Sequence, residues 1–218
     1  MCATIAKAFK RITTPHRKLD LRKQFEYLYT ASPDVSRLVE VPPLQYLMVN
    51  GAGDPNTSVA FQLAVESLYA VAYRLKFALR RGDLPVDYPV MPLEGLWWAD
   101  DSSAFRFERR DEWKWTLMTM VPDLVSPGSF VQTIAELEKK RPLALLGQVR
   151  LESLCEGTCA QTLHVGPYAA EPASIARLHA YVVERQCDLR GRHHEIYLND
   201  PKRTPPAELR TILRHPVE

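Results

Sequence analysis

The sequence has no long hydrophobic run and no strong excess of charge. No stretch approaches the ~20 apolar residues that a membrane-spanning helix needs, and the N-terminus is too short and too interrupted by lysine for a secretory signal. Lys and Arg number 28 against 26 Asp and Glu, whereas a dedicated nucleic-acid-binding protein usually has an obvious basic surplus. We therefore expect a cytoplasmic protein without membrane association and without a specific nucleic-acid partner.

Cysteines are few, and their spacing argues against a metal site. Cys155 and Cys159 could be grouped with His164, His193 and His194, but the two cysteines lack zinc-knuckle spacing and no second pair supports them. Small buried or free thiols are the simpler interpretation, and a lone His164 is more typical of a structural residue. We expect no metal and no cofactor.

Standard catalytic and phosphate-binding motifs are also missing. The segment GAGDPN has two glycines but neither GxGxxG nor a Walker lysine, and the chain contains no GxSxG or HExxH. Apolar residues make up 46% and charged residues 25% of the 218 residues, which is typical of a globular protein. Any chemistry must therefore come from how side chains are brought together.

The order of predicted elements repeats in the two halves of the chain. Residues 1–43 form a polar, proline-punctuated N-terminal extension, with one helix expected over 20–29. The domain spans 44–218. Its first module, about 44–121, and its second, about 158–218, are each predicted to have the order strand, helix, strand, strand. In the first module these elements are expected over 44–51, 57–80, 88–98 and 113–121, and a connecting helix over 127–140 follows. In the second module they are expected over 158–166, 174–187, 193–200 and 209–217.

This repeat predicts an α+β fold with duplicated modules and antiparallel sheets. Two such modules would pair about a pseudo-twofold axis, with their helices covering one side of each sheet. The other side would then face a shared, concave cleft, which is a favoured location for a ligand.

Candidate site residues follow from strand alternation. In HHEIYLND, Ile196 and Leu198 are expected to point into the helix-covered core, and Glu195 and Tyr197 into the cleft. A carboxylate is rarely buried without a partner, so Glu195 on an inward face is informative. The alternative is that Glu195 makes an ordinary surface ion pair with an arginine.

The first half supplies a counterpart. Glu94, Trp97 and Trp98 lie in LEGLWW, and a stripe of Tyr69 and Tyr73 runs beside the core stripe of the long helix. We expect these residues to converge with Glu195 on one cleft. The alternative places the tryptophans in the core and the tyrosines on its shoulder.

Two kinds of chemistry suit this set of side chains. Aromatic faces with a carboxylate bind a flat, lipophilic and often cationic ligand through stacking, cation–π attraction and charge pairing. A desolvated glutamate can instead take a proton from water while a tyrosine hydroxyl donates to a developing oxyanion.

Several segments together resemble the GyrI-like small-molecule-binding proteins, in particular their stand-alone subgroup, from about residue 18 onward. In chain order these segments are KLDLRKQFEYLYTAS, LQYLMVNGAGDPN, ESLYAVAYRLKF, MPLEGLWW, WTLMTMVPDLV, TLHVGPYAAEPASI, HHEIYLNDPKRT and LRTILRHPVE. The resemblance implies two strand–helix–strand–strand modules that form a ligand-binding groove, as in effector-binding domains of transcription activators.

The resemblance also implies a function. Stand-alone members are similar both to multidrug-binding proteins and to hydrolases that open cyclopropane rings of DNA-alkylating natural products. The expectation is sequestration or sensing of lipophilic or cationic compounds, with detoxification by ring-opening hydrolysis as the alternative. Regulation through a protein partner, as in gyrase-inhibiting relatives, stays open. The residues implied are Glu195, Tyr197 and Tyr69 as catalytic groups, and Glu94, Trp97, Trp98, Tyr73, Glu195 and Tyr197 as ligand contacts.

Overall fold

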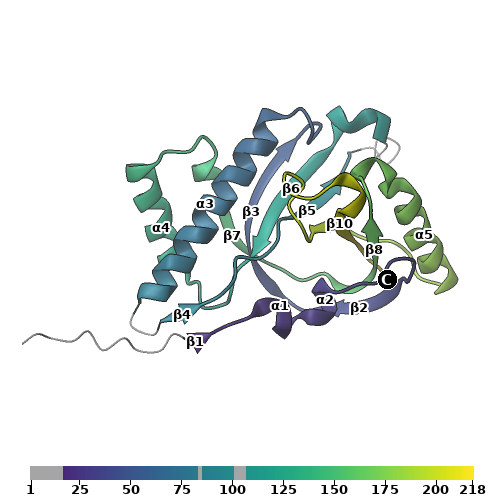
Figure 1. Ribbon diagram of the computed structural model, residues 1–218, viewed down its shortest axis with the longest axis horizontal. Coiled ribbons are helices and arrows are strands. Elements are labelled where there is room, and N and C mark those ends of the chain that lie inside the picture. The colour runs from purple at the N-terminus through teal and green to yellow at the C-terminus, as the bar shows by residue number, and fades with distance from the viewer. Residues whose placement is uncertain (1–16, 83–84, 101–106) are drawn as a thin grey trace, which may run out of the picture.

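Eight strands form one curled antiparallel sheet in the computed structural model, which describes residues 17–82, 85–100 and 107–218 (Figure 1). A short parallel pair, β1 (Arg17–Lys18) and β4 (Val86–Asp87), lies apart from it. In sheet order the eight strands are β2 (Arg37–Val41), β8 (Gly157–Val165), β10 (Arg210–Pro216), β9 (His193–Tyr197), β5 (Glu94–Trp98), β6 (Lys114–Met120), β3 (Leu44–Ala52) and β7 (Arg150–Leu154).

The sheet order confirms the predicted duplication. Strands β3, β6 and β5 of the first module are mirrored by β8, β10 and β9 of the second, and the two modules meet where β5 pairs with β9. Each first strand is followed by a helix, α3 (Val59–Arg81) after β3 and α5 (Glu171–Glu184) after β8. The α+β fold predicted from the sequence is therefore confirmed, with the pseudo-twofold axis between β5 and β9.

The outermost strands are exchanged between the modules. β2 directly precedes β3 in the chain but pairs with β8, whereas β7 directly precedes β8 but pairs with β3. Neither strand was predicted, and β2 lies within the segment assigned to the N-terminal extension. Each module thus completes the sheet of the other.

Helices α3 and α5 cover the same face of the sheet, on either side of the β5–β9 pair (Figure 1). Ser58 caps α3 by accepting a hydrogen bond from the backbone N–H of Phe61, which satisfies a donor that the first turn leaves free. Ser126 caps α4 (Pro127–Lys140) in the same way, and α4 packs against α3. In the part of the chain that the structure describes, no helix is long and apolar enough to cross a membrane.

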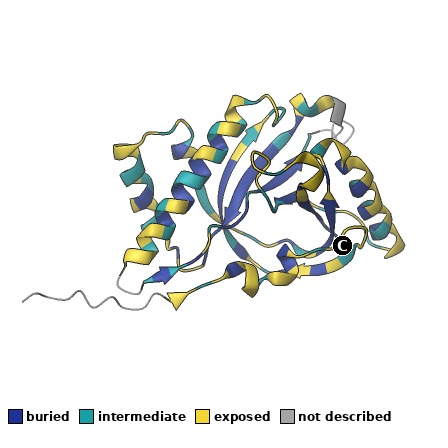
Figure 2. Ribbon diagram, in the orientation of Figure 1, coloured by how far each residue is buried: buried dark blue, intermediate teal, exposed yellow. Residues whose placement is uncertain are grey.

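An N-terminal segment covers the opposite face of the sheet. The helix expected over 20–29 is two short helices, α1 (Leu21–Gln24) and α2 (Glu26–Tyr29), because Phe25 leaves the helical conformation between them. Leu28 and Tyr29 pack with apolar side chains of that face, and Figure 2 shows the strands beneath as buried. The described residues also contain four short 3₁₀ helices: η2 (Phe107–Glu112), η3 (Leu146–Gln148), η4 (Tyr168–Ala170) and η5 (Pro206–Glu208).

Candidate functional site

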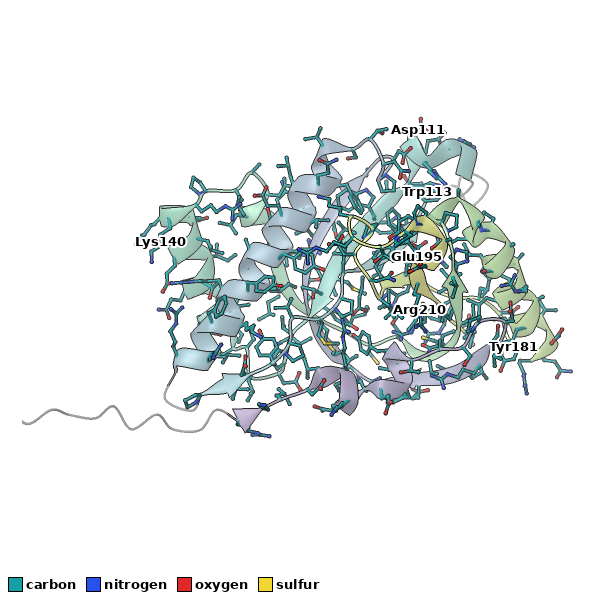
Figure 3. The ribbon with its side chains drawn as sticks, viewed as in Figure 1. Asp111, Trp113, Lys140, Tyr181, Glu195 and Arg210 are labelled. Atoms are coloured by element: carbon teal, nitrogen blue, oxygen red, sulfur yellow. The ribbon has the colours of Figure 1, made fainter. Side chains whose placement is uncertain are left out.

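Glu195 lies on the helix-bearing face, in the central part of the molecule between α3 and α5 (Figure 3). Cross-strand pairing puts it in one row with Val49, Leu117, Gly95 and Leu213, and opposite residues of a ladder share a face. These apolar neighbours pack under the two helices. Glu195 therefore lies on the part of the sheet between the two helices.

Three polar side chains on this face form a hydrogen-bonded chain. The indole Nε1 of Trp97 donates to the Tyr197 hydroxyl at 3.2 Å, and that hydroxyl donates to Glu195 Oε2 at 2.6 Å. Gly95 makes the arrangement feasible, because a Cβ there would lie 2.8 Å from Trp97 Nε1. Burial, followed by the charge of Glu195, raises the pKa of Tyr197 well above its usual value.

The face assignment made from the sequence is wrong for this strand. Ile196 does not point toward the helices but packs with Leu28 and Tyr29 on the opposite face, and Tyr197 packs with the α3 cluster. The alternation of side chains along the strand was predicted correctly, but the two faces were exchanged. The reason is that the sequence did not reveal an N-terminal segment covering the second face.

Glu195 is not a surface ion-pair residue. It is 8% exposed, and among the described residues no lysine or arginine forms a salt bridge with it. Its other close neighbour is His193, whose Nε2 lies 3.4 Å from Oε1. A carboxylate that is buried beside a phenol and an imidazole, without a lysine or arginine, is favourably placed to pair with a further positive charge.

A second carboxyl group approaches Glu195, and sequence reasoning missed it. Glu171 begins α5 and belongs to its buried stripe with Ser174, Leu178 and Val182. Burial, followed by the charge of Glu195, raises the pKa of Glu171 to about 9. The spacing of that stripe could have identified Glu171, but the helix was predicted to begin three residues later.

Tyr168 in η4 closes over the same group. Its ring meets that of Tyr197 edge to face, with 5.8 Å between centroids. Burial, followed by Glu171, raises its pKa to about 12. His164 anchors this region, because its ring nitrogens pair with Ser174 Oγ at 2.9 Å and with the Pro167 carbonyl at 3.2 Å. His164 is thus structural, as expected.

The tryptophans divide between the two faces. Trp97 is a core residue, stacked against Phe61 and edge-on to Trp113. Trp98 alternates to the other face, where the Arg192 guanidinium lies 3.5 Å from the centre of its ring. Of these two residues, Trp97 shares the face of Glu195 and Trp98 does not, so the expected convergence of both on one cleft is wrong.

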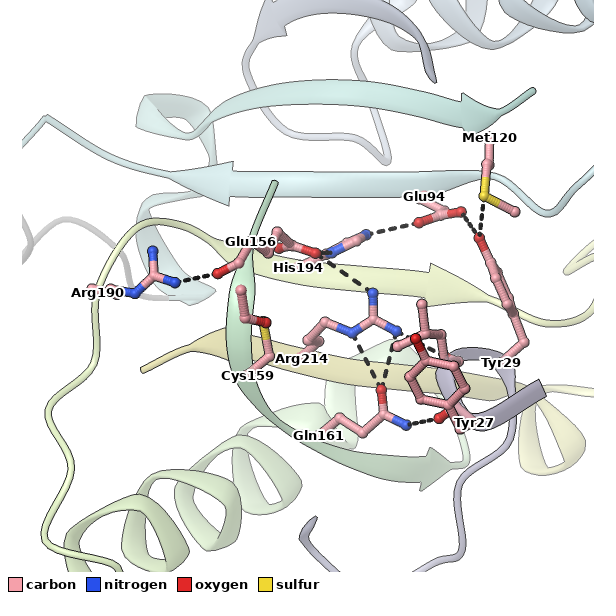
Figure 4. Close-up of polar contacts among 12 residues, drawn as sticks. Tyr27, Tyr29, Glu94, Met120, Glu156, Cys159, Gln161, Arg190, His194 and Arg214 are labelled. Atoms are coloured by element: carbon pink, nitrogen blue, oxygen red, sulfur yellow. Dashed lines mark hydrogen bonds and ion pairs between the residues drawn. The ribbon is translucent and has the colours of Figure 1, made fainter. Parts of the chain in front are cut away.

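Glu94 lies on the face opposite to Glu195. It pairs with Ile196 across the β5–β9 ladder and is completely buried. Tyr29 donates to its Oε1 at 2.7 Å, and His194 Nε2 lies 3.0 Å from its Oε2 (Figure 4). The expectation that Glu94 and Glu195 share one cleft is therefore wrong, and the second carboxyl beside Glu195 is Glu171.

Glu94 belongs to a buried charged network that ties the modules together (Figure 4). His194 lies between Glu94 and Glu156, with Nδ1 3.0 Å from Glu156 Oε2. Arg214 Nη1 is 3.5 Å from the same carboxylate, and its Nη2 donates to the Leu28 carbonyl at 2.8 Å. Burial lowers the pKa of His194, but Glu156 and Glu94 outweigh it and raise that pKa to about 9.

Tyr69 and Tyr73 lie on α3. Together with α4 they line a shallow groove of about 420 Å³, which Glu195 does not line. Tyr73 is 49% exposed. Tyr69 is partly buried beside Leu93 and Asp200, and burial followed by Tyr73 raises its pKa. The backbone N–H of Tyr197 donates to the carbonyl of Leu93, and Tyr69 lies against the same Leu93. Tyr69 therefore borders the site of Glu195, whereas Tyr73 faces outward.

Metal coordination has no support in the described residues, where no cluster of three or more His, Cys, Asp or Glu could hold an ion. Cys155, Cys159 and Cys187 are free thiols, and burial raises the pKa of Cys159 to about 12.

Comparisons with known proteins agree with this fold. Residues 35–218 match the family model of the GyrI-like small molecule binding domain. An uncharacterized conserved protein from Listeria innocua is 35% identical, with a TM-score of 0.85 over 92% of this chain and 100% of its own. A hydrolase from Listeria innocua is 33% identical, with a TM-score of 0.84 over 93% and 100%. The EcmrR C-terminal domain shares the fold at 12% identity, with a TM-score of 0.53 over 84% and 97%. No curated protein matches the chain.

Proposed function

The chain belongs to the GyrI-like small-molecule-binding family, and from this premise we propose that it binds lipophilic, cationic small molecules between α3 and α5. The site consists of Glu195, Tyr197 and Trp97, with Tyr69 at its border. Glu94 and Trp98 are not part of it, because they lie on the opposite face of the sheet.

The observation that carries this proposal is the buried carboxylate of Glu195. It accepts a hydrogen bond from Tyr197 and lies near His193, yet it forms no salt bridge with a described lysine or arginine. A desolvated carboxylate attracts a cation strongly. The rings of Tyr197 and Tyr168 add flat apolar surface, which favours an aromatic cation through stacking and cation–π attraction, and Trp97 holds the Tyr197 hydroxyl in place.

Fluorescence polarisation with a planar cationic dye tests the proposal directly. We expect micromolar binding, about −8 kcal/mol. Glu195→Gln keeps the shape but removes the charge, so it should weaken binding of the dye at least about tenfold, roughly 1.4 kcal/mol. Binding of a neutral dye of similar shape should change little.

Two control variants sharpen this test. Glu152→Gln removes a carboxylate from β7, far along the sheet order from β9, and Trp98→Ala removes an indole from the opposite face. Both should leave dye binding unchanged. Equal binding by wild type and Glu195→Gln would show that the site lies elsewhere, and loss of binding in Trp98→Ala would locate it on the other face.

A second candidate function is hydrolysis of a strained ring conjugated to a carbonyl, such as the cyclopropane of DNA-alkylating natural products. The hydrogen bond from Tyr197 to Glu195 and the similarity to a Listeria hydrolase favour it. Glu195 would accept a proton from water, and a tyrosine, Tyr197 or Tyr69, would donate toward the oxygen that gains charge.

Chromatography of a cyclopropane-bearing alkylator incubated with the protein tests this second function. Loss of a general base costs about 10²–10⁴ in rate, so Glu195→Gln should nearly abolish turnover. Product that forms no faster than in buffer, for compounds that do bind, would leave only the binding function.

A further inference from the structure

Glu171 reaches the site from a different element than Glu195 does. It stands at the first position of the inward stripe of α5, and it is 2% exposed. The next stripe residue, Ser174, is held to β8 by His164. Thr211 on β10 pairs with both His164 and Tyr197, and its hydroxyl is near enough to the Glu171 carboxyl to act on the pKa of that group. The helix is thus fixed with the Glu171 carboxyl beside Thr211 of β10, next to the strand β9 that carries Glu195 and Tyr197.

Two buried polar atoms at this position lack a partner among the described residues. They are Oε1 of Glu171 and Oγ1 of Thr211, which is 1% exposed. The hydroxyl of Thr211 is near enough to the carboxyl to lower the pKa of Glu171, but burial and Glu195 act more strongly in the opposite direction. An ionised carboxylate left without partners in such surroundings is costly, whereas a neutral carboxyl group is tolerated and offers an O–H donor.

We propose that Glu171 and Glu195 act as one acid–base pair that holds a single proton, with Glu171 as the proton donor and Glu195 as the proton acceptor of the site. The geometry favours Glu171 over the tyrosine as donor, because the Tyr197 hydroxyl already donates to Glu195 at 2.6 Å. The chemistry of the proposal rests on the hydrolytic function above, but the shared proton does not.

The pair balances the ring-opening reaction. Water forms a bond to a ring carbon while a ring C–C bond breaks, and the electron pair of that bond moves through the conjugated system to the carbonyl oxygen. Glu195 accepts the proton that water loses, and Glu171 donates its proton to that oxygen. Glu195 is then protonated and Glu171 ionised, so transfer of one proton between them restores the pair. No proton has to enter from solvent.

The surroundings of Glu171 and Glu195 favour a pair that holds one proton over a pair in which both carboxyl groups are ionised. The ordinary effect of a helix N-terminus is to stabilise a negative charge on Glu171, and Arg110 acts in the same direction. Burial and Glu195 outweigh both, as the pKa of about 9 shows. The other titratable groups around the pair are Tyr168 from η4, Tyr197 and His193 from β9, and Asp200 beyond the end of β9.

Carboxyl-carbon NMR of protein labelled with ¹³C-glutamate, titrated from about pH 4 to pH 10, tests the shared proton without any substrate. We expect one carboxyl of the pair to stay protonated at neutral pH and its signal to vanish in Glu171→Gln. In Glu195→Gln the Glu171 midpoint should fall, because the like charge has gone. Glu184→Gln, at the exposed end of α5, is the matched control. A Glu171 that is ionised at neutral pH, or whose midpoint ignores Glu195→Gln, overturns the proposal.

Turnover of a strained-ring substrate tests the donor role. Glu171→Gln should lower kcat by about 10²–10⁴ with little change in KM, and the alkaline decline of the wild-type kcat should disappear with it. Tyr197→Phe should cost less. Glu171→Asp, which keeps a carboxyl group, serves as a second variant in case Glu171→Gln does not fold. Full activity in Glu171→Gln would refute the donor role. If wild type hydrolyses none of the compounds that it binds, the hydrolytic function fails, and the NMR titration still decides the shared proton.

Discussion

Glu171 makes folding sensitive to pH. Its pKa rises from 4.5 to about 9, so between these values the folded protein keeps a proton that the unfolded chain has released. Stability therefore falls as pH rises through this range. His194 acts in the same sense, because its contribution is complete below about pH 6.5 and is lost as pH rises through about 9.

Glu171→Gln should remove one of these two effects. We expect the melting temperature of the variant to exceed that of wild type increasingly as pH rises from about 5 to about 9. Differential scanning calorimetry across this range measures the change. A melting temperature for the variant that falls as steeply as that of wild type would place the pH dependence on His194 alone.

For single residues, the sequence predicted which kinds of side chain form the site better than it predicted where each one lies. Strand alternation correctly put Glu195 and Tyr197 on one face, because the side-chain period of a strand is fixed. Pairing Glu94 with Glu195 was wrong, because the register between β5 and β9 brings Gly95 opposite Glu195, and nothing local in either strand sets that register.

The pairing of β3 with β6 depends on a glycine. Gly51 pairs with Trp115, and a Cβ at Gly51 would lie 2.0 Å from the indole. The Trp115 ring, fully buried and edge-on to Phe61, therefore occupies the space above the strand. The lack of a side chain at Gly51 thus makes room for the Trp115 ring, which belongs to the same aromatic cluster as Trp97.

Gly51→Ala should therefore destabilise the protein by about 1–3 kcal/mol, the usual cost of overpacking. Urea unfolding followed by circular dichroism measures it. Gly147→Ala is the matched control, because nothing lies within 4 Å of a Cβ placed there. An equal effect of both substitutions would mean that helix or strand propensity, and not the indole, decides the cost.

Elements with strong periodicity were predicted well, and short edge strands were not. The caps and apolar stripes of α3 and α4 located both helices within two residues. β2 and β7 have five residues each and few buried side chains, so their strand character comes from pairing with distant partners. α5 began earlier than expected, because a buried glutamate in its first turn does not look apolar in sequence.

Across the whole molecule, the His194 network joins parts that are far apart in the chain. Glu94 comes from the first module, His194 and Arg214 from the second, and Tyr29 from the N-terminal segment. Two carboxylates face an imidazolium and a guanidinium without access to water. Such a group is stable when complete, and losing one charge leaves another unpaired.

His194→Gln should cost about 3–5 kcal/mol, because it leaves Glu94 and Glu156 close together without the charge between them. Arg150→Gln breaks the exposed pair with Glu152 and should cost less than about 1 kcal/mol. Guanidinium unfolding of both variants at neutral pH provides the comparison. A small loss in His194→Gln would mean that Arg214 alone neutralises the two carboxylates.

The exchange of β2 and β7 constrains how the chain can fold while it is being made. Glu40 and Thr158, which pair across β2 and β8, are 118 residues apart, and at roughly 5–20 residues per second the ribosome needs about 6–24 seconds to make that interval. During this time β2 has left the ribosome without its partner strand, and the first module lacks β7. The nascent chain thus carries unpaired strand edges on β2, β3 and β5 until their partners β8, β7 and β9 have been made, and unpaired edges of this kind favour aggregation.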